Sequence, residues 1–320
     1  MVVVKIMQGL GNQMFQYAAG RALALHLNTT LKVNTDNYSA TSLRQYELSK
    51  FFEINPPIIT TEEMQLFPLA HPVRRFWNKF FPSKKIRALP YEEVNILVKI
   101  LYRTCYIFRK PHLQRVYEEK QFHFDNDFFN AKSPVFLKGY WQSYKYFDRF
   151  KESIKKDFIV RKELVAHLSD IKNEMNNVNS IALHIRCTDK LSPTHLKLHG
   201  TLTKKYYENG IEYIKRNLIG NNICIYVFTD DVNVAKEYVP EGYNTIWLSG
   251  FVTKNAIEDF YLMQHAKGIV ASNSTFSWWA AYLNIHEKPL VIVPEKWYVN
   301  AQYNDKDIYP KDWVLLNQSY

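Results

Sequence analysis

Short apolar runs alternate with helix-like spans throughout the second half of the chain. The runs cover residues 181–185, 223–228, 245–248, 268–271 and 290–293, and the helix-like spans lie near 203–217, 232–238, 256–266 and 276–284. Short apolar runs between helical spans are typical of buried strands joined by helices. This order predicts an α/β fold whose parallel sheet is covered by helices on both faces.

The amino-terminal residues show the same order of strand, turn and helix. Residues 2–7 have a strand pattern and residues 8–13 form a turn with two glycines. The next segment has a helical pattern whose shared face is formed by Met14, Tyr17, Ala18, Arg21 and Leu25. Such a turn lets the backbone approach a ligand closely. It is not a dinucleotide fingerprint, because Met14 occupies the third glycine position, and it is not a Walker A loop.

Length and composition allow two domains. The chain has 320 residues, of which 47% are hydrophobic and 15% aromatic, so it can bury substantial cores. The charged segment 151–179 has few strand signals and is the expected boundary region. We therefore expect an amino-terminal domain at 1–160 and a carboxyl-terminal domain at 161–320.

A cluster of small polar residues follows the apolar run at 268–271. Residues 272–275 are Ser, Asn, Ser and Thr, and an apolar helical pattern begins directly after them. The free N–H groups and hydroxyls at such a helix N-terminus bind anions, so a phosphate pocket is one interpretation. Ordinary helix capping beside two core Trp residues is the other.

His184, Arg186 and Asp189 collect at the carboxyl end of the strand pattern that starts at residue 180. Ligands of open α/β sheets lie outside the carboxyl ends of the strands. A guanidinium there is well placed to hold a diphosphate, although a structural Arg–Asp ion pair is an alternative.

Asp230 and Asp231 end the strand pattern at 223–228. Such carboxylates bind a metal, accept from a sugar hydroxyl or cap the next helix, and we expect capping for at least one of them. Adjacent side chains point in different directions along an extended backbone, which disfavours a shared metal.

Five motifs in this chain together resemble glycosyltransferase family 11, the alpha-1,2-fucosyltransferases of bacterial type. They are GLGNQMFQY at 9–17, RQYEL at 44–48, HIR at 184–186, SNSTFSWW at 272–279 and YPKDW at 309–313. The stretch between about 60 and 120 matches poorly. The resemblance implies two facing Rossmann-like domains of the GT-B type with the active site in the cleft. It also implies inverting transfer of fucose from GDP-fucose to the 2-hydroxyl of a galactose in an acceptor glycan.

The resemblance and the chemistry together assign the candidate site. Cleavage of the fucosyl–phosphate bond leaves negative charge on GDP, which an arginine or a metal must stabilise. We recognise no isolated Asp-x-Asp between a strand and a loop of the sort that metal-using sugar transferases carry, so we expect Arg186 with Ser274 and Thr275 to hold the diphosphate without a metal or another cofactor. The expected catalytic residues are Asn12, His184, Arg186 and Asp189, and the expected donor-binding residues are Gly9, Gly11, Gln13, Asp230, Asp259, Ser274, Thr275 and Phe276.

Asp259 is assigned by its place in the resemblance. Related fucosyltransferases carry an acidic residue some fifteen positions before the phosphate serine, and its carboxylate can accept from guanine N1 and N2 together. A helix-surface Asp beside Glu258 is the alternative. The general base stays open among Asp36, Glu47, His184 and Asp189, because an inverting transfer needs a carboxylate or His near the acceptor hydroxyl.

The chain departs from the family at Cys187, where the usual motif has a second Arg. Successive strand residues face opposite sides, so only one of the two positions can address the donor, and Arg186 remains. The departure also motivates a rival hypothesis, a GDP-sugar-binding homologue that has lost turnover.

Charge and cysteines suggest the compartment. The net charge is +10, and residues 71–110 carry ten Lys or Arg against two Glu, interleaved with aromatics. This segment is either a peripheral contact with an anionic membrane or a solvated basic face. A membrane or nucleic-acid adaptor is the remaining rival, but no nucleic-acid motif accompanies the charge. Three cysteines without metal-ligand spacing, and no signal peptide or spanning segment, predict a cytoplasmic protein.

Overall fold

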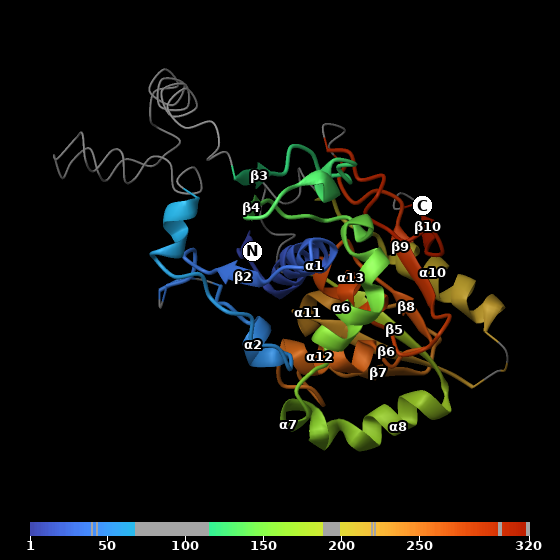
Figure 1. The fold of residues 1–320 in the computed structure, drawn as a ribbon. Helices are drawn as coiled ribbons and strands as arrows, with labels where there is room; N and C mark the ends of the chain where they lie inside the picture. The colour runs from blue at the N-terminus through green and yellow to red at the C-terminus, as the bar shows by residue number, and fades with distance from the viewer. Residues whose placement is uncertain are drawn as a thin grey trace, which may run out of the picture.

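The computed structural model describes residues 1–39, 41–42, 44–67, 115–187, 199–218, 220, 222–299 and 303–317. Within these residues the chain forms two sheets, a four-stranded sheet from the amino-terminal half and a six-stranded sheet from the carboxyl-terminal half. Figure 1 shows α1 (Leu10–His26) and α13 (Thr275–Tyr282) side by side near the centre of the molecule, between the strands of the two sheets. Three features of the sequence lie outside the described residues, namely Asp189, Cys105 and the basic segment 71–110.

Five of the six strands of the carboxyl-terminal sheet form where the apolar runs predict them, and the sixth, β10 (Val314–Leu316), lies beyond the last of these runs. The other five are β5 (Asn179–Ile185), β6 (Ile223–Thr229), β7 (Thr245–Trp247), β8 (Gly268–Val270) and β9 (Leu290–Pro294). All neighbours are parallel, in the order β10-β9-β8-β5-β6-β7. In chain order, β6 and β7 are therefore added on one side of β5, and β8, β9 and β10 are added on its other side. This is the strand order of a Rossmann-like domain, with its topological switch point between β5 and β8.

Helices cover both faces of this sheet, as the alternation predicts. α10 (Lys204–Asn217) and α11 (Val232–Ala235) pack on one face, against a cluster that includes Ile181, Leu183 and Val227. α12 (Ala256–Met263) and α13 pack on the other face, where Ala182, Tyr226 and Phe228 point. The strands are buried on both sides because each alternate residue meets one of these two helical layers.

The amino-terminal sheet is smaller and is also parallel. Its members are β1 (Val2–Lys5), β2 (Leu31–Asn34), β3 (Val116–Glu118) and β4 (Val135–Lys138), in the order β2-β1-β4-β3. The short helices α2 (Leu48–Phe51), η1 (Glu63–Leu66) and η4 (Phe128–Asn130) belong to the same half.

Helix α1 is buried on nearly all sides, which goes beyond the single shared face that its sequence pattern predicts. Thirteen of its seventeen residues are buried. The reason is its position, because α1 packs against its own sheet on one side and against α13 of the other half on the other.

Aromatic side chains fill the space between the two halves. The Phe15 ring lies 4.5 Å from Trp278 and 5.0 Å from Trp279, measured between ring centroids. Phe147 stacks on Trp279 at 5.1 Å. One continuous apolar cluster runs from Val2 to Trp313 and includes these rings. The two sheets therefore share a core.

The segment between the sheets is helical. It contains η5 (Tyr144–Tyr146), η6 (Asp148–Phe150), α6 (Lys151–Asp157), α7 (Lys162–Val165), η7 (Ala166–Leu168) and α8 (Ser169–Asn177). The low strand signal of this segment thus reflects helices, and the exact domain division at residue 160 stays a prediction. No helix in the described part of the chain combines the length and the apolar character that crossing a bilayer requires.

Candidate functional site

A cavity of about 820 Å³ opens between the two halves. The amino-terminal half contributes the turn at 8–12, Arg44, Glu47, Phe122, Tyr140 and Gln142 to its walls. The carboxyl-terminal half contributes side chains from the loops that follow the strands of its sheet. This is the location that the Rossmann-like order favours, because ligands of such sheets lie outside the carboxyl ends of the strands.

The strand order arranges the carboxyl-terminal side chains in a row. Ser249 follows β7, Asp230 follows β6, Arg186 follows β5, Ser274 follows β8 and Tyr298 follows β9. Neighbouring strands are about 4.8 Å apart, so the row from β7 to β9 spans four spacings, or about 19 Å. Arg186 and Ser274 follow β5 and β8, the two neighbouring strands of the switch point, near the middle of this row.

Arg186 is held by Asp230. The Nε of Arg186 lies 3.2 Å from Oδ2 of Asp230, and both side chains are partly exposed to the cavity. The other oxygen of Asp230 accepts a hydrogen bond from the Cys187 backbone N–H at 2.7 Å. Asp230 thereby joins two neighbouring strand ends and orients the guanidinium.

The two adjacent aspartates have different tasks, as the capping hypothesis predicts for one of them. Oδ1 of Asp231 accepts from the backbone N–H groups of Asn233 and Val234 at 3.0 and 3.1 Å, which caps α11. Only Asp230 lines the cavity.

Cys187 faces away from the cavity. Its side chain is 2% exposed and belongs to the cluster on the α10 side of the sheet, together with Ile185. Its Sγ lies 3.6 Å from Oγ1 of Thr229. Arg186 and Cys187 therefore address opposite sides of the strand end, as alternation requires.

The N-terminus of α13 points into the cavity beside His184. The helix begins at Thr275, and the Ser274 hydroxyl accepts from the Phe276 N–H at 3.3 Å as an N-cap. Ser274, Thr275 and Phe276 all line the cavity. Nδ1 of His184 lies 2.8 Å from the Ser272 hydroxyl, which fixes the imidazole at the strand end. The two interpretations of residues 272–275, helix capping and anion binding, are thus compatible. Ser274 caps α13, and the positive end of the helix still faces the cavity.

The glycine turn of the amino-terminal half meets this helix directly. A Cβ on Gly11 would lie 2.5 Å from Oγ1 and 2.6 Å from the backbone carbon of Thr275, so only glycine allows this approach. The indole N–H of Trp279 donates to the Gly11 carbonyl at 3.1 Å. Gln8, at the start of the turn, has a φ of 68°, a left-handed conformation that is unusual for a non-glycine residue.

Gln13 supports the turn from behind and does not line the cavity. Its side-chain N–H groups donate to the carbonyls of Gln8 at 3.0 Å and Gln45 at 2.7 Å, and its Oε1 accepts from the Glu47 N–H at 2.9 Å. It is fully buried. Gln13 therefore connects the glycine turn with the segment at 44–48, the first two motifs of the family resemblance.

Asn12 is oriented by a relay of side chains from both halves. The Tyr298 hydroxyl donates to Oε1 of Gln142 at 2.9 Å, and Nε2 of Gln142 donates to Oδ1 of Asn12 at 2.7 Å. This bond fixes Oδ1 toward Gln142, and the Nδ2 group of Asn12 can donate to a ligand. Neither Gln142 nor Tyr298 stands out in the sequence.

Asp259 lies at the far end of the row, in the first turn of α12. Its carboxylate accepts from the hydroxyls of Ser249 at 2.8 Å and Thr253 at 2.5 Å, and all three residues line the cavity. Burial raises the pKa of Asp259 to about 6. Each oxygen keeps a second lone pair for a ligand, because each accepts only one of these bonds.

The four candidates for a general base lie in different places. Glu47 and His184 line the cavity, whereas Asp36 does not and accepts instead from Nδ2 of Asn34 at 3.0 Å. Asp189 lies outside the described residues. Burial raises the pKa of Glu47, and the positive charges of Lys50 and of Arg44, which also lines the cavity, partly offset this effect.

No group of three or more His, Cys, Asp or Glu side chains comes together as a metal site would require, within the described part of the chain. The independence from a divalent cation stays a prediction.

Comparison with known proteins gives a family and a fold that agree with this geometry. The family model Glycosyl transferase family 11 matches residues 1–317. An alpha-1,2-colitosyltransferase from Escherichia coli is 31% identical over 322 residues, covering 99% of both chains. A galactoside 2-alpha-L-fucosyltransferase from Caenorhabditis elegans is 21% identical and covers all of this chain and 80% of its own. The crystal structure of NodZ alpha-1,6-fucosyltransferase soaked with GDP-fucose superimposes with a TM-score of 0.51 at 16% identity, over 88% of this chain and 91% of that one. The two-domain GT-B fold is thus confirmed.

Proposed function

The chain belongs to glycosyltransferase family 11, and we propose that it transfers fucose from GDP-fucose to the 2-hydroxyl of a galactose unit in a bacterial glycan, with inversion and without a metal. The observation that carries the proposal is the meeting of Arg186, the N-terminus of α13 and the Gly9–Asn12 turn in one cavity at the switch point. The relative named as a galactoside 2-alpha-L-fucosyltransferase supports the sugar and the linkage.

The guanine base is assigned to the β7 end of the row. Asp259 can accept from N1–H and N2–H of guanine together, because Ser249 and Thr253 hold the carboxylate in place without using all of its lone pairs. Adenine has an acceptor at N1 and no amino group at position 2. Asp259 would therefore select GDP over ADP.

The diphosphate is assigned to the middle of the row. The Arg186 guanidinium, oriented by Asp230, and the positive end of the α13 dipole would stabilise the negative charge that develops on the departing GDP. The Asn12 amide, oriented by Gln142, faces the same region from the other half and can donate to the phosphate or to the reacting sugar.

Glu47 is the general base that we favour among the four candidates. It lines the cavity on the amino-terminal side, and burial raises its pKa, which brings a carboxylate closer to the range in which it accepts a proton efficiently. In the proposed step the acceptor oxygen forms a bond to fucose C1 and gives its proton to Glu47, while the C1–O bond to GDP breaks.

Colitose is the second candidate for the transferred sugar. The relative that is 31% identical is named as an alpha-1,2-colitosyltransferase. Colitose differs from fucose by the absence of the 3-hydroxyl, so the same nucleotide and diphosphate contacts serve both donors. Initial rates with GDP-fucose and GDP-colitose at equal concentration would decide between the two sugars.

Isothermal calorimetry tests the nucleotide assignment. We expect GDP to bind the wild-type chain and ADP to show negligible heat, and Asp259→Asn to weaken GDP binding by about tenfold, because the amide replaces one acceptor by a donor. GDP affinity should fall as the pH drops through about 6, since the Asp259 carboxyl then takes up a proton and loses acceptor capacity.

Two results would contradict this proposal. Equal binding of GDP and ADP would remove the role of Asp259, and transfer that is lost in EDTA and restored by Mn²⁺ or Mg²⁺ would remove the metal-free mechanism. Ser249→Ala is a matched control that removes only one of the hydrogen bonds that hold the carboxylate, so it should weaken GDP binding less than Asp259→Asn does.

A further inference from the structure

Three aromatic rings line the cavity at the β9 end of the row, away from Asp259. The ring of Phe122 lies 4.9 Å from Tyr303 and 5.5 Å from Tyr298, and the two tyrosine rings are 5.2 Å apart, measured between centroids. Phe122 and Tyr303 are partly exposed, and all three rings line the cavity. We call these three residues the aromatic platform.

The platform combines segments that are remote in the sequence. Phe122 follows β3 in the amino-terminal half, whereas Tyr298 and Tyr303 follow β9 in the other half. Asp305 connects the segment of Tyr303 to that of Tyr298, because its carboxylate accepts from the N–H groups of Trp297 at 2.7 Å and Tyr298 at 3.2 Å.

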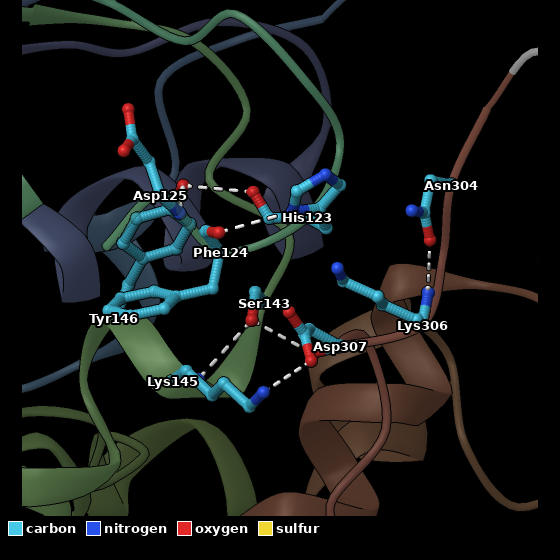
Figure 2. A network of polar contacts seen from close by, with 9 residues as sticks. All are labelled: His123, Phe124, Asp125, Ser143, Lys145, Tyr146, Asn304, Lys306 and Asp307. Atoms are coloured by element: carbon cyan, nitrogen blue, oxygen red, sulfur yellow. Dashed lines mark hydrogen bonds and ion pairs between the residues drawn. The ribbon is translucent and has the colours of Figure 1, made fainter. Parts of the chain in front are cut away.

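One short turn, η5, fixes both segments, as Figure 2 shows. The Tyr146 hydroxyl accepts from the Asp125 N–H at 3.0 Å and donates to the His123 carbonyl at 3.3 Å, which holds the segment of Phe122. Lys145 forms an ion pair with the Asp307 carboxylate, and the Ser143 hydroxyl donates to the Asp307 carbonyl at 2.8 Å. These contacts hold the segment of Tyr303. The platform is therefore a preformed surface.

The chemistry of the platform fits a sugar ring. A pyranose has faces of C–H groups that bury apolar area against flat aromatic rings, while its hydroxyls stay at the ring edge. In galactose the C–H groups at carbons 3, 4 and 5 share one face, and the 2-hydroxyl projects from the edge. Stacking on that face leaves the 2-hydroxyl free to react.

The position of the platform separates it from the nucleotide. In the proposed assignment guanine binds at the β7 end of the row and the diphosphate at its middle, and the platform lies at the β9 end, beyond the diphosphate. Tyr298 also reaches Asn12 through Gln142, so the platform is connected to the amide that is proposed to contact the phosphate or the reacting sugar.

We propose that Phe122, Tyr298 and Tyr303 form the acceptor subsite, which binds the C–H face of a galactose unit. This inference rests on the proposed transferase function and adds the surface that selects its acceptor.

The test compares ring-removing with ring-retaining variants. We expect Phe122→Ala and Tyr303→Ala each to raise the acceptor KM by about tenfold, whereas Tyr303→Phe, which keeps the ring, should change it by less than twofold. Tyr213→Ala, on the exposed face of α10, is the matched control for the loss of a partly exposed tyrosine. Thermal unfolding should show that each variant is folded.

A direct readout uses methyl β-galactoside with the wild-type chain and GDP. Saturation-transfer NMR should show the strongest transfer to protons 3, 4 and 5, and Tyr303→Ala should abolish it. An unchanged acceptor KM in both alanine variants, or a rise in the GDP-fucose KM in place of the acceptor KM, would overturn the inference. Normal GDP binding with such a result would leave the proposed function intact, while absence of GDP binding by the wild-type chain would count against the proposed function itself.

Discussion

The two walls of the cavity are built in different ways. The carboxyl-terminal wall takes its groups from strand ends, and partners at the ends of neighbouring strands fix them, as Asp230 fixes Arg186 and Ser272 fixes His184. The amino-terminal wall contains a turn whose key amide, Asn12, is fixed by Gln142 of the same half, and Tyr298 of the other half holds Gln142 in place. The first wall follows from the topology of one sheet, and the second exists only when both halves have packed together.

This difference predicts how each wall responds to mutation. Groups on the carboxyl-terminal wall act on the ligand directly, so their loss should remove one contact with little effect elsewhere. Gln142 and Tyr298, which orient Asn12 in the amino-terminal wall, act through one another. The loss of turnover when either is mutated should therefore be smaller, and the two losses should not add.

The largest expected effect is at Arg186. Arg186→Ala should lower turnover about a hundredfold, or about 3 kcal/mol, because it removes a charge-assisted contact that strengthens as the diphosphate departs. Arg186→Lys should not restore full activity, since a point charge cannot reproduce the guanidinium fork. Turnover at saturating GDP-fucose is the measurement. A folded Arg186→Ala variant with near wild-type turnover would show that the carboxyl-terminal wall does not hold the leaving group.

An intermediate effect is expected at Gln142. Gln142→Leu should lower turnover about tenfold, because it releases the Asn12 amide. GDP affinity should stay nearly unchanged if Asn12 donates to the reacting sugar, and should fall if Asn12 donates to the phosphate. Tyr298→Phe keeps the ring and removes only the hydroxyl that orients Gln142, so it should act in the same direction and more weakly.

The double variant of Gln142 and Tyr298 sharpens this comparison. If the two residues form one relay, Gln142→Leu with Tyr298→Phe should be no slower than Gln142→Leu alone. Strictly additive losses would mean that Tyr298 acts on its own, and the amino-terminal wall would then be no different in kind from the other wall.

The smallest effect is expected at Cys187. Cys187→Ala should change turnover by less than twofold and lower the free energy of unfolding by about 1 kcal/mol or less, because the thiol is buried on the α10 side and away from the cavity. Parallel assays with Arg186→Ala provide the contrast. A loss at Cys187 as large as that at Arg186 would mean that both faces of the strand end serve the donor.

The sheet and its strand ends could be read from the sequence. The five apolar runs after residue 180 coincide with β5 to β9, and the polar groups at their ends reach the cavity. These features depend on local periodicity and on the rule that parallel strands end at one edge. The family resemblance was equally local, because its motifs are short and contiguous.

Other features required contacts that no local pattern contains. Gln142 and Tyr298 are single polar residues whose value comes from partners 130 and 156 residues away. Arg44 belongs to a quoted motif, yet nothing in its neighbours showed that it would face the cavity. Asp36 shows the reverse, since a carboxylate after a strand was a reasonable candidate but lies outside the cavity walls. Gln13, expected at the donor, lies behind the turn that carries Asn12.

The contact of Gly11 with Thr275 bears on how the enzyme would admit its substrates. Two domains that open and close need a polar interface that tolerates water. Here the interface between the two halves contains Phe15, Phe147, Trp278 and Trp279. Baring one such ring to water costs about 5 kcal/mol, from roughly 200 Å² at 25 cal/mol per Å². We expect the two halves to stay packed together during a catalytic cycle, so that the donor enters through the mouth of a cavity that does not open further. Selection among donors would then occur at the entrance and walls of the cavity, without a hinge motion between the two halves.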